Sequence, residues 1–128
     1  MDFLLDTCTF LWMISDPDKL SKKAVNACRN SDNKLYLSTV SCWEIALKVS
    51  LGKLNLKGDP EVFIPQQRIK HAVDLLPLGE KASLYINKIP KIHRDPFGRM
   101  LVSQAICHDL SIITPDKMIG DYDAKVLW

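Results

Sequence analysis

Short apolar segments that alternate with helix-like segments limit most strongly how this chain can fold. Residues 3–6, 35–38 and 111–114 are rich in Leu, Ile, Phe or Tyr, and each has the length of a short buried strand. The longer segments between them carry apolar residues three and four positions apart, which is the spacing of an amphipathic helix. Buried strands joined by helices are typical of a parallel sheet covered on both faces. The pattern therefore predicts an α/β protein, a three-layer α/β/α sandwich with a central, mostly parallel sheet.

Capping signals predict where several helices begin and end. Asp59-Pro60 and Asp95-Pro96 each place an N-cap aspartate before a proline at the first helical position. Ser41 and Glu44 match the Ser-x-x-Glu capping box, which predicts a helix from Ser41 to about residue 51, stopped by Gly52. Other helices are expected over residues 7–14, 21–30, 80–88 and 95–108, and other extended segments within 72–78 and at 126–128.

Length and composition favour one domain spanning residues 1–128. No apolar stretch approaches the roughly 20 residues of a membrane helix, and Met1–Asp6 lacks the basic segment of a secretory signal. The four cysteines are far apart and form no Cys-x-x-Cys pair, so we expect reduced thiols in a cytoplasmic protein rather than a zinc site. The net charge of +2 is too small to indicate nucleic-acid binding by itself.

Acidic residues stand where strands are expected to end. Asp6 closes the first apolar run, Asp116 follows the third, and Glu44 lies in the helix after the second. Side chains at the carboxyl ends of parallel strands face the crevice where ligands bind. Carboxylates gathered there repel one another unless a cation such as Mg²⁺ or Mn²⁺ neutralises them. Each acid also has a local alternative, because Asp6, Asp95 and Asp116 can cap helices and Glu44 can complete the capping box.

Basic residues crowd the segment from 88 to 99. It contains Lys88, Lys91, Arg94 and Arg99 together with His93, against a single acid. Two interpretations are open: a solvated loop, or a rim in which Lys91, Arg94 and Arg99 contact phosphates beside the acidic site. For Arg99 a plain helix-surface role is equally compatible with the pattern, and for His93 a loop position without a catalytic role is favoured.

Several short blocks follow one another along the chain. They are Leu4-Leu5-Asp6-Thr7, Trp43-Glu44-Ile45-Ala46 with Gly52-Lys53-Leu54, His93-Arg94-Asp95-Pro96-Phe97, residues 99–105, Thr114-Pro115-Asp116 and Val126-Leu127-Trp128. In this order they resemble PIN-domain ribonucleases of the VapC toxin type. The resemblance extends over nearly the whole chain, and the blocks together are far more specific than any one alone.

The resemblance implies a PIN-like fold and an endoribonuclease that requires Mg²⁺ or Mn²⁺. It also implies an RNA substrate, often tRNA or rRNA, a small antitoxin protein as partner, and a homodimer. Asp6 and Asp116 match the family as the leading metal ligands, and Glu44 as a third ligand or as the group that orients a metal-bound water. For Thr7 two interpretations are open: its hydroxyl hydrogen-bonds within the site, or it serves the start of the helix. Asp95 is expected to have an auxiliary role.

Gly98 departs from the family pattern. Similar proteins carry a second aspartate there, in Asp-Pro-Phe-Asp-Arg-Met-Leu, whereas this chain reads Asp-Pro-Phe-Gly-Arg-Met-Leu from Asp95. Glycine is also a weak helix residue, costing roughly 0.5–1 kcal/mol against alanine. Either the natural protein has lost activity, or the chain was altered to remove toxicity. We favour alteration, because a toxic nuclease selects for inactive copies; an unaltered gene that encodes Gly98 would refute it.

Two other function classes compete with a nuclease. Gly98 favours a catalytically inactive PIN-like module that binds RNA or a protein partner, whereas intact Asp6, Glu44 and Asp116 speak against it. A phosphatase of the haloacid-dehalogenase type would also place an aspartate after its first strand. That class needs a second aspartate two residues later, where this chain has Cys8.

Overall fold

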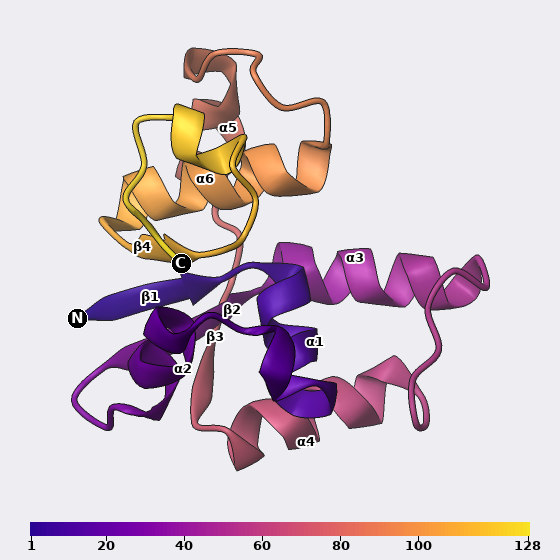
Figure 1. The fold of residues 1–128 in the computed structure, drawn as a ribbon. Coiled ribbons are helices and arrows are strands. Elements are labelled where there is room, and N and C mark those ends of the chain that lie inside the picture. The colour runs from indigo at the N-terminus through magenta and orange to yellow at the C-terminus, as the bar shows by residue number, and fades with distance from the viewer.

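Five parallel strands form the centre of the molecule, in the order β3-β2-β1-β4-β5 (Figure 1). The computed structural model describes every residue from Met1 to Trp128. All four strand pairs are parallel, which confirms the predicted α/β/α class and its sheet. The strands are β1 (Asp2–Leu5), β2 (Lys34–Ser38), β3 (Val73–Leu76), β4 (Ser111–Ile113) and β5 (Val126–Leu127).

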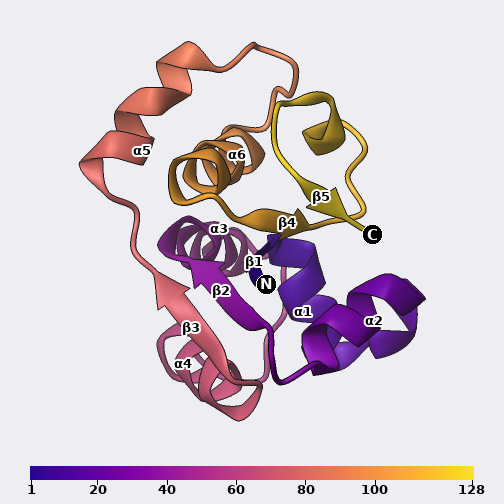
Figure 2. The same ribbon diagram turned by 90° about the vertical axis from the view of Figure 1, so that its left-hand side faces the viewer.

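Helices cover both faces of the sheet (Figure 2). Along β1, Phe3 and Leu5 pack into one apolar cluster and Leu4 into the other, so alternate side chains anchor the two outer layers. None of the helices has both the length and the apolar character needed to cross a membrane. The helices are α1 (Thr7–Ser15), α2 (Lys22–Arg29), α3 (Thr39–Ser50), α4 (Pro60–Lys70), α5 (Glu80–Tyr85) and α6 (Pro96–His108), with 3-10 turns η1 (Pro17–Lys19), η2 (Ile86–Lys88) and η3 (Ile119–Asp121).

Most predicted helix ends agree with the structure. Asp95 caps α6 by accepting a hydrogen bond from the Phe97 amide at 3.0 Å. Gly52 has a φ of +72° after the end of α3, a conformation that glycine adopts without steric cost. The Lys53 amide donates to the Lys48 carbonyl and the Gly52 amide to the Val49 carbonyl, which is the Schellman arrangement.

The capping box predicted at Ser41 is wrong. Helix α3 begins at Thr39, directly after β2, and the Ser38 hydroxyl caps it by accepting from the Val40 amide. Ser38 is fully buried and also hydrogen-bonds Gln104 of α6, so a tertiary contact fixes the start of the helix. Glu44 is therefore more than one turn into α3, and its carboxylate is free to enter a site formed with other elements.

Candidate active site

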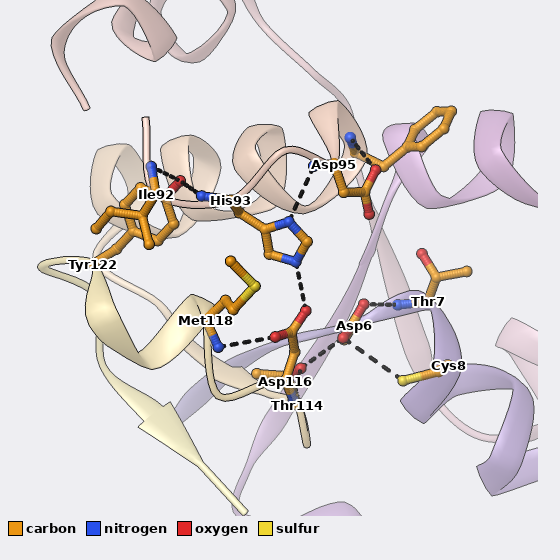
Figure 3. A network of polar contacts seen from close by, with 11 residues as sticks. Asp6, Thr7, Cys8, Ile92, His93, Asp95, Thr114, Asp116, Met118 and Tyr122 are labelled. Atoms are coloured by element: carbon orange, nitrogen blue, oxygen red, sulfur yellow. Dashed lines mark hydrogen bonds and ion pairs between the residues drawn. The ribbon is translucent and has the colours of Figure 1, made fainter. Parts of the chain in front are cut away.

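Asp6 and Asp116 are connected through one hydroxyl group beyond the carboxyl ends of β1 and β4. Asp6 Oδ2 accepts a hydrogen bond of 2.6 Å from Thr114 Oγ1 (Figure 3). The same Thr114 oxygen accepts from the Asp116 amide at 3.0 Å. Thr114 is almost fully buried and follows β4, which lies beside β1 in the sheet. Two acids that are 110 positions apart in the chain are thus held at one edge of the sheet.

Asp6 is also the N-cap of α1, so its local and functional interpretations are compatible. Its Oδ1 accepts from the Thr7 amide at 2.7 Å. Burial raises the pKa of the Asp6 carboxyl above its ordinary value, against the opposing effect of the hydrogen bonds from Thr114 and Thr7. The charge of Glu44 raises the Asp6 pKa further. An ionised Asp6 is therefore unfavourable without a cation nearby, and a bound cation would relieve that cost.

The Asp6→Asn variant is expected to be more stable than the parent chain at pH 7 in metal-free buffer. Because the folded-state pKa of Asp6 is raised, the folded protein binds more protons than the unfolded chain above about pH 4, and its stability falls as the pH rises through that window. Asparagine removes this loss and keeps an acceptor for the Thr7 amide. Thermal unfolding should show a gain of a few degrees at pH 7 that shrinks toward pH 4; a gain independent of pH would contradict this explanation.

Glu44 is buried, and each of its carboxylate oxygens has a partner. Its Oε1 accepts from the Thr7 hydroxyl at 2.8 Å, and its Oε2 pairs with Lys48 Nζ one turn along α3. The Thr7 hydroxyl is also hydrogen-bonded to the Ser41 hydroxyl at 2.9 Å. The hydrogen bond that Lys48 donates to Glu44 raises the pKa of Lys48, and the negative charges of Asp95 and Asp6 act in the same direction. Lys48 is therefore the cation that the fold itself supplies to this acidic cluster.

His93 binds Asp116 from the loop that precedes α6. Its Nε2 lies 2.7 Å from Asp116 Oδ2, and its Nδ1 lies 3.0 Å from the Asp95 amide nitrogen. Asp116 Oδ1 accepts from the Met118 amide at 2.9 Å, so Asp116 closes the turn before η3, near the helix start that the sequence suggested. This contact of His93 could not be predicted from the sequence, because no local motif links it to an acid 23 positions later.

The space beside Gly98 admits a side chain. Gly98 is buried in the first turn of α6, and a Cβ added there would lie 3.6 Å from Asp95 Oδ2 and 3.7 Å from His93 Cδ2. These are ordinary van der Waals distances, so a Cβ fits there without moving the backbone. Asp95 caps the helix with Oδ1, and its Oδ2 is directed toward the region of Asp6 (Figure 3). The structure therefore leaves room for a Cβ at the position where the resemblance leads us to expect an aspartate.

The basic residues of the loop differ in their surroundings. Lys91 and Arg94 are exposed beside the site. Arg99 is half-buried: its guanidinium donates to the Ile86 carbonyl at 3.3 Å, and its Nε is buried without a partner. Arg99 thus joins α6 to η2 within the fold, whereas Lys91 and Arg94 are free to meet a ligand.

Some residues of the site region were not found from the sequence. Lys48 and Thr114 carry no motif of their own; the Glu44–Lys48 spacing of four positions on a helix was the one local signal. Trp12 packs against the apolar core, with its ring 6.1 Å from that of Trp128. Trp43, although it is a large apolar residue in a helix, is 63% exposed and meets Phe97 edge-on, with ring centroids 5.0 Å apart. Exposed Trp43 and half-buried Phe97 form an aromatic pair, each one position from Glu44 or Gly98 in the chain.

Cys8 does not supply a charged group at the position of the second aspartate of a phosphatase. Its Sγ lies 3.6 Å from Asp6 Oδ2, and burial, with the charge of Asp6, raises the pKa of the thiol to about 12. The sulfur therefore remains protonated near neutral pH and donates to Asp6. All four cysteines are free thiols.

The donor chemistry of the site suits a hard divalent cation, but the ligand set is incomplete. Asp6 and Asp116 offer oxygen atoms, which Mg²⁺ and Mn²⁺ prefer. No group of three or more His, Cys, Asp or Glu side chains is placed to hold a metal ion. Glu44 is paired with Lys48, and position 98 carries no carboxylate. Asp6 and Asp116 thus offer the right kind of ligand atoms for a divalent cation, and an aspartate at position 98 would add a further carboxylate in this region.

Comparisons with known proteins agree with this architecture. The PIN domain family model matches residues 3–125. The fold resembles VapBC2 from Rickettsia felis, solved bound to a DNA fragment from its promoter, with a TM-score of 0.72, 13% identity, and coverage of 99% of this chain and 98% of that chain. FitAcB from Neisseria gonorrhoeae gives a TM-score of 0.64 at 20% identity, covering 98% and 96% of the two chains. VapBC-1 from nontypeable Haemophilus influenzae gives a TM-score of 0.64 at 17% identity, covering 99% of this chain and 97% of that chain.

No curated protein matches the sequence. The family model nevertheless spans nearly the whole chain, and the solved structures share its fold from end to end. The protein therefore belongs to the PIN-domain family.

Proposed function

We propose that this chain is the toxin of a VapC-type toxin–antitoxin pair, an endoribonuclease that depends on Mg²⁺ or Mn²⁺ and is weakened by Gly98. PIN-domain proteins are in general nucleases, and the three structural neighbours include VapBC complexes. The observation that carries the proposal is the joining of Asp6 and Asp116 through the Thr114 hydroxyl. Two carboxylates held together at the carboxyl edge of a parallel sheet form a cation site beside a ligand crevice.

Each residue of the cluster has a part in this mechanism. A bound divalent cation would lower the pKa of a coordinated water and offset the charge that develops on the scissile phosphate. Asp6 and Asp116 would hold the cation, oriented by Thr114 and by the amides of Thr7 and Met118. Glu44, fixed by the Thr7 hydroxyl, would accept a hydrogen bond from water in the site or add a third ligand oxygen.

An RNA substrate is supported by the charges around the acids. Lys91 and Arg94 are exposed on the loop that leads into α6, where they can contact phosphates on either side of the scissile bond. The Trp43–Phe97 pair offers a surface on which an unpaired base can stack. Arg99 supports the same loop from within through the Ile86 carbonyl. We propose a single-stranded region of tRNA or rRNA as the substrate.

A small antitoxin protein is the proposed partner. A groove of about 460 Å³ lies between α1, residues 54–57 and α4, and both apolar side chains and two lysines, Lys57 and Lys70, line it. An amphipathic segment with acidic side chains would match that surface. The groove is lined by Leu11, Ile14, Ser15, residues 54–57, Phe63, Gln66, Gln67 and Lys70.

A homodimer is also proposed, and the exposed apolar side chains of α3 support it. Leu47 and Leu51 are 37% and 58% exposed and lie four positions apart at the C-terminal end of α3. Exposed apolar side chains gathered on one helix face are typical of a contact with another chain.

The ends of the RNA products test the reaction class. Attack by a metal-activated water leaves a phosphate on one product and no cyclic ester, whereas attack by the neighbouring ribose hydroxyl leaves a 2′,3′-cyclic phosphate. We expect the Gly98→Asp protein, incubated with total tRNA and Mn²⁺, to give products without cyclic phosphate, as read by mass spectrometry. Cyclic phosphate on every product would contradict metal-dependent hydrolysis.

Gly98 and Lys48 favour a second candidate, a catalytically inactive PIN-like module that binds RNA or a partner. The ion pair of Lys48 with Glu44 already compensates one charge of the cluster without metal. This candidate predicts RNA binding that is equal with and without Mn²⁺, and no cleavage even after an aspartate is placed at position 98.

A further inference from the structure

His93 is the one histidine among the acidic residues, and three contacts fix it. Its backbone amide donates to the Tyr122 hydroxyl at 2.8 Å, and the Ile92 amide donates to the same oxygen at 3.2 Å. Its ring lies between the Asp95 amide and the Asp116 carboxylate (Figure 3). Tyr122 is 5% exposed, so the oxygen that holds this loop is part of the core. A loop histidine without a role needs no such restraint.

The contacts of the ring determine where its hydrogen lies. A backbone N–H can only donate, so the Asp95 amide at 3.0 Å requires a lone pair on His93 Nδ1. A neutral imidazole with a free Nδ1 carries its hydrogen on Nε2, which then donates to Asp116 Oδ2 at 2.7 Å. A nitrogen that carries a hydrogen cannot ligate a metal ion. His93 is therefore a hydrogen-bond donor to Asp116 rather than a candidate ligand.

The two oxygens of Asp116 are held by different groups. Oδ1 accepts from the Met118 amide within its own turn, and Oδ2 accepts from the His93 ring. The turn alone leaves the carboxylate attached at one oxygen, whereas the ring fixes the second and sets the plane of the group. The ring also adjoins position 98, because a Cβ there would lie 3.8 Å from His93 Nε2. His93 therefore lies next to both Asp116 and position 98.

We propose that His93 is a positioning residue for the nuclease reaction: its Nε2–H fixes the orientation of the Asp116 carboxylate, and the Asp95 amide selects the tautomer that does so. The inference rests on the proposed function, because the orientation matters for a cation shared with Asp6. Hydrogen-bond partners of metal ligands typically contribute 10- to 100-fold to metal affinity. The His93 ring is such a partner: the Asp95 amide orients it, and it hydrogen-bonds the proposed ligand Asp116.

Calorimetric titration with Mn²⁺ tests this role, in the Gly98→Asp protein and with three further substitutions. His93→Ala is expected to weaken Mn²⁺ binding about 10-fold. His93→Gln should recover most of that loss, because the amide N–H of glutamine can donate near the place of Nε2. The exposed His108→Ala at the end of α6 is the matched control and should leave the affinity unchanged. Thermal unfolding shows that each variant is folded.

The tautomer is tested separately on the unsubstituted chain by ¹⁵N NMR of the His93 ring, which should show hydrogen on Nε2 and none on Nδ1. Hydrogen on Nδ1 would overturn the inference, even if the variants failed to fold. Equal Mn²⁺ affinities for His93→Ala and its parent would also overturn the inference about His93. The proposed function would not be contradicted by that result, because Mn²⁺ would still bind. A loss in His93→Gln as large as in His93→Ala would assign the effect to ring packing and also overturn it. Absence of Mn²⁺ binding in the Gly98→Asp protein would overturn both the role of His93 and the proposed metal-dependent function.

Discussion

Gly98→Asp is expected to raise RNA cleavage by about 100-fold or more and to tighten Mn²⁺ binding, which corresponds to about 3 kcal/mol in the transition state. The new carboxylate would stand in the first turn of α6, where the helix dipole favours a negative charge. It would extend the oxygen set of Asp6 and Asp116 to three carboxylates. The contacts available to its Cβ, 3.6–3.8 Å, require no rearrangement of the backbone.

Gly98→Asn is the matched control for this gain. Asparagine has the size of aspartate and similar helix propensity, but it adds no charge. Calorimetric titration with Mn²⁺ should therefore rank the aspartate protein first and leave Gly98→Asn near the parent chain. Equal affinities for all three proteins would exclude position 98 as a source of a metal ligand.

Asp6→Asn, placed in the Gly98→Asp protein, is expected to return cleavage to the level measured without metal and to abolish the Mn²⁺-dependent rise in melting temperature. Asparagine still accepts from the Thr7 amide, so α1 keeps its cap. What is lost is the negative charge that burial makes costly and that a cation would compensate. The same substitution should thus remove activity and raise metal-free stability, a trade typical of functional sites.

Asp32→Asn provides the comparison for this variant. Asp32 lies exposed in the turn before β2, so its substitution should change neither cleavage nor the effect of Mn²⁺. Cleavage rates and melting temperatures, each with and without Mn²⁺, distinguish the two variants. Metal-dependent cleavage that survives Asp6→Asn would show that Asp6 is not a ligand.

Features that depend on neighbouring residues could be predicted from the sequence. The strand at residues 3–6, the helix starts after Asp59 and Asp95, and the stop at Gly52 agree with the structure within a residue or two, although only Asp95 makes a capping hydrogen bond with its side chain. The start of α3 could not be predicted, because Ser38 and Ser41 are both good caps locally. The buried contact of Ser38 with Gln104 favours the earlier one.

The parts of the site that depend on distant residues could not be predicted. The hydroxyl of Thr114 joins Asp6 to Asp116 only because β4 pairs with β1, and nothing local specifies that pairing. The pairing of His93 with Asp116 depends in the same way on a loop anchored by Tyr122. The exposure of Trp43 depends on which face of α3 the neighbouring helices cover. The apolar pattern of the helix alone therefore could not predict that this side chain is exposed.

The proposed metal-dependent ribonuclease, weakened at one ligand position, can be tested by RNA cleavage with the parent chain and Gly98→Asp side by side, each with Mn²⁺, with Mg²⁺ and with EDTA. We predict strong cleavage by Gly98→Asp, abolished by EDTA, and little or none by the parent chain. Equal cleavage by both proteins would contradict the assigned role of position 98. Absence of cleavage by both, on tRNA and rRNA alike, would contradict the nuclease itself and favour a binding module.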